Sequence, residues 1–193
     1  MAVTAVTETL VEVGECKRVF DSIAVFDVLK DEDVAELSLH LRARDYVAGA
    51  TIFYEDDDSD AVYFIVEGAV EIFKSDQSGK KLPLAILRDH GLLGEMGLLN
   101  GTPRTATARA LCQTRCLYLP ATTFSQSLHD GSVPVHRLVL AFARILSQRL
   151  SSMDERLFAL FENTTDNERF REINEFKHRL LATWTGLSLD TQG

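Results

Sequence analysis

Short apolar and β-branched runs, separated by glycines and other turn residues, fill the chain between positions 42 and 119. Alternation with a period of two indicates half-buried strands, and seven of the eleven glycines lie between Gly49 and Gly101. This spacing favours an antiparallel β-roll of jelly-roll type, with tight hairpins at Glu67-Gly68 and Ser78-Gly79. The predicted strands are Arg44–Val47, Thr51–Tyr54, Ala61–Glu67, Ala69–Lys74, Lys81–Leu87, Arg104–Ala110 and Thr114–Leu119.

Apolar residues follow helical spacing on both sides of this region, so the sequence predicts a mainly β fold with flanking α-helices. Two short helices are expected between Phe20 and Leu41, with Asp31 placed to cap the second. A short helix over residues 122–128 precedes a long one over 133–161, and a last amphipathic helix covers 167–184. The long helix carries a nearly heptad apolar seam at Val135, Val139, Phe142, Leu146, Leu150, Met153, Leu157 and Leu160.

Length and charge narrow the possible classes of protein. The chain has 193 residues, of which 46% are hydrophobic, and its formal net charge is −9. An acidic surface repels phosphate backbones, so no nucleic acid partner is expected. No apolar run reaches the roughly 18 residues of a membrane span, and the N-terminus has no secretory pattern. We therefore expect a cytoplasmic protein with no membrane partner.

Few residues are arranged for metal or catalytic chemistry. Cys16, Cys112 and Cys116 form an odd, sparse set, which is typical of free thiols in a reducing compartment. No second Cys/His pair stands at metal-ligand spacing, and no histidine cluster or nucleophile turn is present in the sequence. The expectation is that the protein has no metal, no catalytic residue and no enzyme activity.

The most informative segment is GLLGEMGLLNGTPRTATARA, residues 91–110. It predicts a glycine-rich turn, one turn of helix over Glu95–Leu99, a second turn and a strand from Arg104. The first N–H groups of a helix and an arginine both suit phosphate oxygens, and Gly94 lets a ligand approach the backbone. Glu95 would repel a phosphate unless it accepts a hydrogen bond from an attached ribose hydroxyl. With a single arginine and no Gly-Lys-Ser/Thr loop, these residues indicate a ribonucleotide with one negative charge.

This segment resembles the phosphate-binding cassette of the cyclic nucleotide-binding domain family, which includes the catabolite activator protein and the regulatory subunits of cyclic-nucleotide-dependent kinases. The resemblance covers about Phe20 to Phe161, and it departs from the family pattern near Asp57, where a glycine is usual. Because aspartate tolerates a positive φ, we expect that turn to be preserved. The matching residues are Gly94-Glu95, Gly101-Thr102-Pro103-Arg104-Thr105-Ala106, Gly49-Ala50-Thr51-Ile52-Phe53 and Tyr63-Phe64-Ile65-Val66-Glu67-Gly68-Ala69-Val70.

The resemblance implies an eight-stranded β-roll that binds cAMP or cGMP without any further cofactor. Glu95 would accept a hydrogen bond from the ribose 2′-OH, and Arg104 would pair with the cyclic phosphate. The Thr105 hydroxyl and the backbone N–H groups of Met96 and Ala106 would assist. We divide the chain into an N-terminal arm (residues 1–19), the nucleotide-binding β-roll (20–130), the long helix (131–162), and a last helix with a tail (163–193).

Several alternatives stay open at this point. Glu95 and Arg104 could form a surface ion pair of little consequence. The seam of the 133–161 helix could pack on the β-roll or, as in the family, form a homodimer interface. Trp184, Phe158 or Phe161 could cover the base as a lid, or anchor the last helix. Thr105 is compatible with either cAMP or cGMP, with cAMP the more common ligand.

Two functions are consistent with these residues. The first is a stand-alone cyclic nucleotide sensor that relays a conformational change to an effector protein. The second is a constitutive protein-interaction module whose pocket holds no ligand. Family transcription factors carry a helix-turn-helix domain after the long helix, and only 32 residues follow Phe161 here. We therefore expect no DNA-binding domain.

Overall fold

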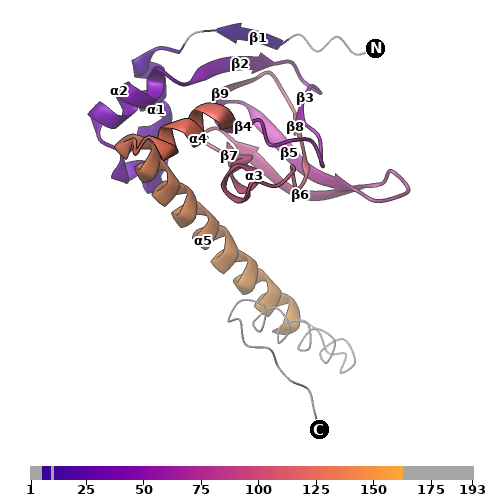
Figure 1. Cartoon of the computed structure of the whole chain (residues 1–193). Coiled ribbons are helices and arrows are strands. Elements are labelled where there is room, and N and C mark those ends of the chain that lie inside the picture. Colours follow the sequence, from indigo (N-terminus) through magenta and orange to yellow (C-terminus); the bar gives the residue numbers. More distant parts are fainter. Residues whose placement is uncertain (1–5, 10, 163–193) are drawn as a thin grey trace. The chain divides into compact units, whose positions relative to one another are not determined.

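A computed structural model of the chain describes residues 6–9 and 11–162, and in these ranges it contains two antiparallel sheets flanked by helices (Figure 1). The first sheet has the strand order β1-β2-β9-β4-β7, and the second has the order β3-β8-β5-β6. The predicted fold class is confirmed. The strands are β1 (Val6–Thr9), β2 (Arg42–Tyr46), β3 (Thr51–Phe53), β4 (Ala61–Glu67), β5 (Ala69–Ser75), β6 (Lys81–Arg88), β7 (Leu92–Leu93), β8 (Thr107–Ala110) and β9 (Thr114–Pro120).

Along the chain, helices precede β2, interrupt the strands between β7 and β8, and follow β9. Two short helices were predicted between Phe20 and Leu41, and in the first half of this range the structure has a 3-10 helix, η1 (Ala24–Val28). The α-helices are α1 (Val13–Asp21), α2 (Asp31–Ser38), α3 (Glu95–Asn100), α4 (Ala121–His129) and α5 (Val133–Glu162).

One apolar core lies between the two sheets. Inward-facing residues of β4 and β9, such as Tyr63 and Cys116, meet Val70 of β5 and Ala108 of β8 in a single buried cluster. Alternation along each strand places these side chains on one face, as the period of two requires. Phe53 and Leu87 pack on the edge of the same cluster.

A second, aromatic core covers the opposite face of β4. The ring of Phe64 contacts Phe20 edge-on at 5.2 Å between centroids, and Phe142 of α5 at 6.3 Å. Val135 and Phe142 are thus buried within the chain's own core at 2% and 0% exposure. These two positions of the predicted dimer seam are therefore not available to a second copy.

Two local predictions were wrong. Gly68 does not close a hairpin, because β4 pairs with β7 and β9 while β5 pairs with β6 and β8. Instead, Gly68 has φ of 113° and turns the chain from one sheet to the other. Asp31 does not cap α2 either, because the N-cap is Lys30, whose backbone N–H donates to the carboxylate of Asp33. The hairpin predicted at Ser78-Gly79 is confirmed between β5 and β6.

The chain divides into two compact units, residues 1–144 and 145–193, and the division falls within α5. In the second unit the described segment is helical as far as Glu162, with Leu150 and Met153 exposed at 38% and 60%. Trp184 and the side chains of Phe158 and Phe161 lie outside the described residues, so the lid hypothesis stays a prediction. The predicted boundary between residues 130 and 131 also stays a prediction.

In the part of the chain that the structure describes, no helix is long and apolar enough to cross a membrane, and no three metal-binding side chains gather. The three cysteines are free. Cys16 and Cys116 are buried, and Cys112 is exposed.

Candidate functional site

Arg104 is at the centre of the cassette. It follows the turn at Gly101 and precedes β8, which begins at Thr107 and not at Arg104 as predicted. The backbone of Arg104 does not join the sheet because it bonds to a loop. Its N–H donates to the carbonyl of Asp57 at 2.8 Å, and its carbonyl accepts from the N–H of Asp56 at 2.9 Å.

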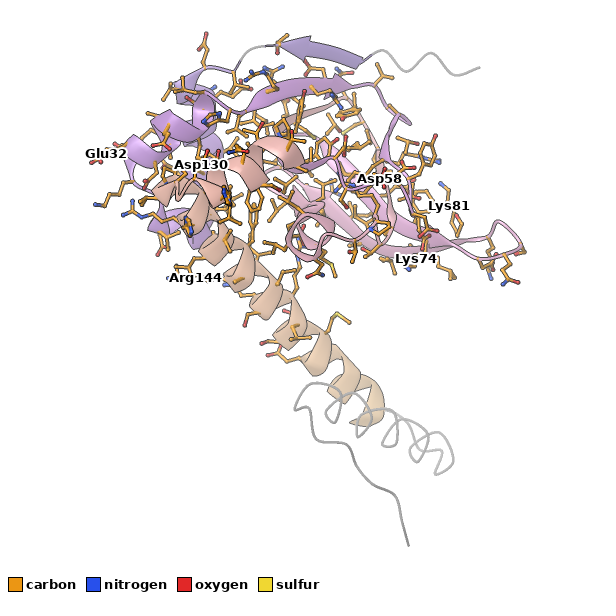
Figure 2. The ribbon with its side chains drawn as sticks, in the orientation of Figure 1. Glu32, Asp58, Lys74, Lys81, Asp130 and Arg144 are labelled. Atoms are coloured by element: carbon orange, nitrogen blue, oxygen red, sulfur yellow. The ribbon has the colours of Figure 1, made fainter. Side chains whose placement is uncertain are left out.

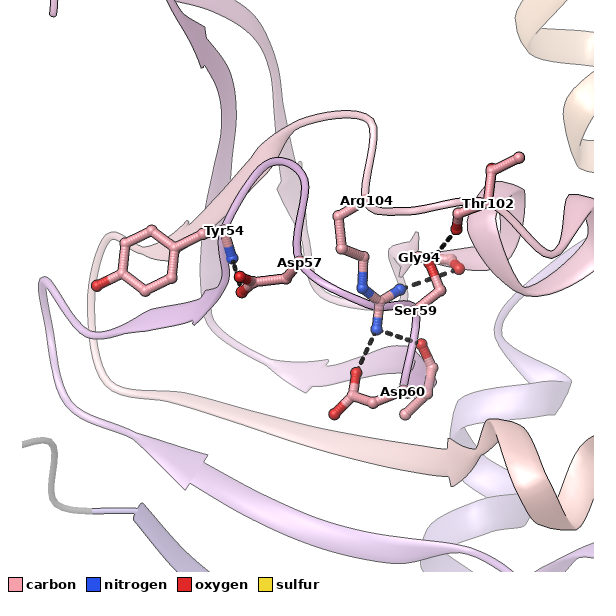
Figure 3. A network of polar contacts seen from close by, with 8 residues as sticks. Tyr54, Asp57, Ser59, Asp60, Gly94, Thr102 and Arg104 are labelled. Atoms are coloured by element: carbon pink, nitrogen blue, oxygen red, sulfur yellow. Dashed lines mark hydrogen bonds and ion pairs between the residues drawn. The ribbon is translucent and has the colours of Figure 1, made fainter.

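The guanidinium of Arg104 is 2% exposed and is held by three acceptors (Figure 3). Its Nη2 donates to Oδ1 of Asp60 at 2.6 Å and to the carbonyl of Ala61 at 2.7 Å. Its Nη1 donates to the carbonyl of Gly94 at 3.2 Å. Nε is buried and has no hydrogen-bond partner among the described residues. Nε of Arg44 and Nε of Arg109 are also buried without a partner, and of these three arginines Arg104 is the one whose guanidinium bonds to Gly94 at the start of α3.

Two aromatic rings pack against the same guanidinium. Its Cζ lies 4.2 Å from the ring centroid of Phe53 and 5.7 Å from that of Tyr63. Stacking on an aromatic face fixes the plane of an arginine without using its N–H donors. Burial, with the nearby charge of Asp60, raises the pKa of Tyr63 to about 12, so this ring is neutral at physiological pH.

Gly94 is required at the start of α3. Its φ is +85°, a conformation that side-chain-bearing residues rarely adopt, and a methyl group on its Cα would collide with Nη1 of Arg104. Gly97 on the same helix is equally confined, because its missing side chain leaves room for the hydroxyl of Ser59. The glycines of the segment therefore let α3 pack closely against the loop before β4 and against Arg104.

Glu95 occupies the first turn of α3 and is only 1% exposed. Helix N-termini favour negative charge, which helps the protein keep a carboxylate at this position. Glu95 and Arg104 are both buried, at 1% and 2% exposure. The alternative of a surface Glu95–Arg104 pair is therefore wrong.

The remaining predicted ligand residues surround this pair. Met96 is 42% exposed in α3, Thr105 is exposed directly after Arg104, and Ala106 is buried at 6%. The structure brings the guanidinium of Arg104 to the carbonyl of Gly94, the residue directly before Glu95. The contacts of Met96, Thr105 and Ala106 with a ligand stay predictions.

The acidic loop before β4 supplies a partner of Arg104 through Asp60. Its carboxylate is 64% exposed but bonds to Arg104, which lies 44 residues further along the chain. In the same loop Asp56 adopts a φ of 67°, so the turn expected near Asp57 is preserved without a glycine. The side chain of Asp57 closes the turn by accepting from the N–H of Tyr54 at 2.8 Å.

A cavity of about 300 Å³ opens beside the cassette, and none of the six predicted ligand residues lines it. Its walls come from the loop before β4, from α3, from the turn at residues 101–103 and from α4. This cavity is therefore a feature distinct from the Glu95–Arg104 pair.

The two sheets thus carry a segment, residues 94–106, in which Glu95 and Arg104 are both buried. Residues 43–130 match the sequence model of the family described as the cyclic nucleotide-binding domain. This match shows that residues 43–130 form a domain of the cyclic nucleotide-binding domain family.

Known proteins show the same relationship. The chain is 28% identical to the cyclic AMP receptor protein of Thermus thermophilus over 86% of its own length and 81% of that protein. It is 23% identical to a CRP-like cAMP-activated global transcriptional regulator of Mycobacterium tuberculosis over 69% of its length, which is 60% of the regulator. A cyclic nucleotide-binding domain from Methylobacillus flagellatus has the same fold, with a TM-score of 0.68 at 19% identity, and the match covers 80% of this chain and 86% of that one.

Proposed function

We propose that this protein is a regulatory sensor that binds a cyclic mononucleotide at Glu95 and Arg104. The observation that carries the proposal is the setting of Arg104: its buried Nε has no acceptor among the described residues, and its Nη1 donates to the carbonyl of Gly94, the residue directly before the buried Glu95. A phosphodiester supplies the acceptor that Nε lacks, and an attached ribose supplies the donor that a carboxylate accepts.

The neighbours of Arg104 explain how it would hold a phosphate. Asp60 and the carbonyl of Ala61 occupy Nη2, and the ring of Phe53 fixes the plane. These contacts leave Nε to donate to a phosphate oxygen without reorienting the side chain. In the proposal, the Thr105 hydroxyl and the N–H groups of Met96 and Ala106 complete the phosphate contacts.

The proposed ligand is cAMP, with cGMP as the alternative. The names of the Thermus and Mycobacterium relatives refer to cAMP, which supports this choice. Thr105 is exposed and carries a hydroxyl that suits either base. No turnover of the nucleotide is proposed, and the protein acts as a regulator and not as an enzyme.

Signalling would follow from a shift between two conformations. The ligand draws α3 and the loop at residues 56–60 together around the phosphate, and the change reaches the junction of α4 and α5 at residues 128–133. A ligand shifts such an equilibrium only by its difference in affinity for the two states. A protein partner then reads the altered position of the C-terminal helices.

We also propose that the protein forms a homodimer through α5. The interface would use only those apolar residues of α5 that are not buried in the chain's own core. Leu150 and Met153 are exposed on consecutive turns of this helix, as an interface would need. Replacing both residues by glutamate should convert a dimer to a monomer in sedimentation velocity, while the same replacement at the exposed pair Gln148 and Ser151 is a control on the same turns. A monomeric wild-type protein would contradict the dimer.

Calorimetric titration tests the function directly. The protein should bind cAMP or cGMP at one site per chain with a dissociation constant of about 1 μM or less, which corresponds to about 8 kcal/mol. Noncyclic 5′-AMP is the control, because it carries a second phosphate charge. Absence of binding to either cyclic nucleotide at millimolar concentration would favour the constitutive interaction module.

A second candidate function is the sensory part of a transcriptional regulator. The expectation of no nucleic acid partner is not supported by the relatives, because the Mycobacterium protein is itself named a transcriptional regulator. Fluorescence anisotropy of labelled duplex DNA, with and without cAMP, separates the two candidates. Sequence-selective DNA binding that depends on cAMP would show that the protein is part of a transcriptional regulator. No change of anisotropy with added protein would favour a sensor that acts on a protein effector.

A further inference from the structure

The cavity beside the cassette is formed by residues that the nucleotide site does not use. Gly97 and Leu98 of α3 form one wall, and Ala121 and Ser125 of α4 form another. Ser59 lies between them and donates its hydroxyl to the carbonyl of Thr102 at 2.8 Å (Figure 3). The cavity therefore spans three segments that are distant in sequence but fixed to one another.

The chemistry of the walls favours a positively charged group. Asp58 contributes an exposed carboxylate, and no lysine, arginine or histidine lines the cavity. The hydroxyls of Ser59 and Ser125 add acceptors near it. Asp56 and Asp57 precede Asp58 in the same loop, so the potential at this side of the cavity is negative.

The size of the cavity favours a single side chain over a large ligand. Binding pockets for small molecules range from about 300 to 1,000 Å³, and this one lies at the lower limit with about 300 Å³. A lysine or arginine side chain carries the required charge on a flexible apolar stem, which matches walls that include Leu98.

The same loop connects the cavity with Arg104. Asp58 and Ser59 line the cavity, while Asp57 bonds to the backbone of Arg104 and Asp60 to its guanidinium. We propose that the cavity receives a lysine or arginine side chain of a protein partner. This inference rests on the proposed function, in which a protein partner reads the state of the nucleotide site.

The test uses amide NMR spectra of the full chain with a small probe, Nα-acetyl-lysine methylamide. The probe should shift the amides of Ser59, Leu98 and Thr102 along a saturable curve with a dissociation constant of about 1 mM, as expected for one side chain. The neutral analogue, acetylated at Nε as well, should leave them unchanged. Shifts spread evenly over the acidic surface would overturn the proposal.

Three variants sharpen the result. Asp58→Asn removes the carboxylate and should weaken probe binding about three-fold, and Ser125→Trp fills the cavity from an exposed position and should abolish saturable binding. Glu32→Gln makes the same charge change on α2, which lies well away from Asp58 in Figure 2, and should have no effect. Equal weakening by Glu32→Gln, or undiminished binding to Ser125→Trp, would refute the cavity as the binding site.

Two further titrations separate this inference from the proposed function. If inorganic phosphate shifts the cavity amides at lower concentration than the lysine probe, an anion site at α4 replaces the proposal. cAMP should shift amides of residues 94–106 in the wild type and in Ser125→Trp alike. If cAMP shifts no amides but the lysine probe binds as expected, the proposed nucleotide site is wrong and the cavity proposal stands. If cAMP shifts the amides of residues 94–106 but the lysine probe does not bind, the cavity proposal is wrong and the nucleotide site stands.

Discussion

Replacing Arg104 by alanine should remove most of the affinity for a cyclic nucleotide. Among the described residues Arg104 is the one buried arginine, at 2% exposure, and the change deletes its Nε, which would meet the phosphate. A hydrogen bond to a charged group contributes about 1.5–3 kcal/mol, so the dissociation constant should rise about 10- to 100-fold. The carbonyls of Ala61 and Gly94 also lose their donor, so some loss of stability accompanies the change.

Calorimetry on the folded variant measures this effect, with circular dichroism to confirm that it is folded at the titration temperature. Arg109→Ala is the matched control, because it removes the same charge from β8, where Arg109 is about one-third exposed and lies near Glu71. Arg104→Lys keeps the charge but loses the planar fork, so it should bind almost as weakly as the alanine variant. Unchanged affinity in Arg104→Ala, or an equal loss in Arg109→Ala, would refute the assignment.

Three further outcomes follow from the structure. The wild type should bind 2′-deoxy-cAMP about ten-fold more weakly than cAMP, and the Glu95→Ala variant should bind the two nucleotides equally. If calorimetry still shows the ten-fold difference in Glu95→Ala, then Glu95 is not the acceptor of the ribose hydroxyl. Asp33→Asn removes the negative charge of the buried carboxylate that pairs with Arg137 and accepts from the α2 N-cap, so it should lower the free energy of unfolding in urea by about 1–3 kcal/mol. Asp27→Asn, at an exposed pair, should change it by less than about 0.5 kcal/mol. Burial raises the pKa of the Cys16 and Cys116 thiols from 9.0 to about 12, so their contribution to stability is complete below pH 9 and is lost as the pH rises toward 12. Urea unfolding at pH 8 and pH 10 checks this trend, and equal stability at both values would contradict it.

The elements that the sequence predicts well are those with a long apolar pattern. β4, β5, β6 and α5 are each at least seven residues long and rich in apolar residues, and each was placed within two residues of its observed ends. β1 was missed because its pairing with β2, and not its own pattern, makes it a strand. Gly68 was misassigned since a local turn signal does not reveal which strands pair across it.

The candidate site shows the same limit. Glu95, Gly94 and Arg104 were found because the cassette places them within eleven consecutive residues. Asp60 and Phe53 contact Arg104 only in the folded protein. Asp60 lies 44 residues from Arg104 in sequence, and nothing in the sequence of the acidic loop distinguishes it from the neighbouring aspartates.

The central claim is that Arg104 and Glu95 hold the two ends of a cyclic ribonucleotide. A crystal structure of the protein with cAMP tests it most directly. A phosphate oxygen should lie within about 3 Å of Nε of Arg104, and the ribose 2′-OH should donate to a carboxylate oxygen of Glu95. Nucleotide bound elsewhere on the β-roll, with the Arg104 Nε still lacking an acceptor, would contradict the account.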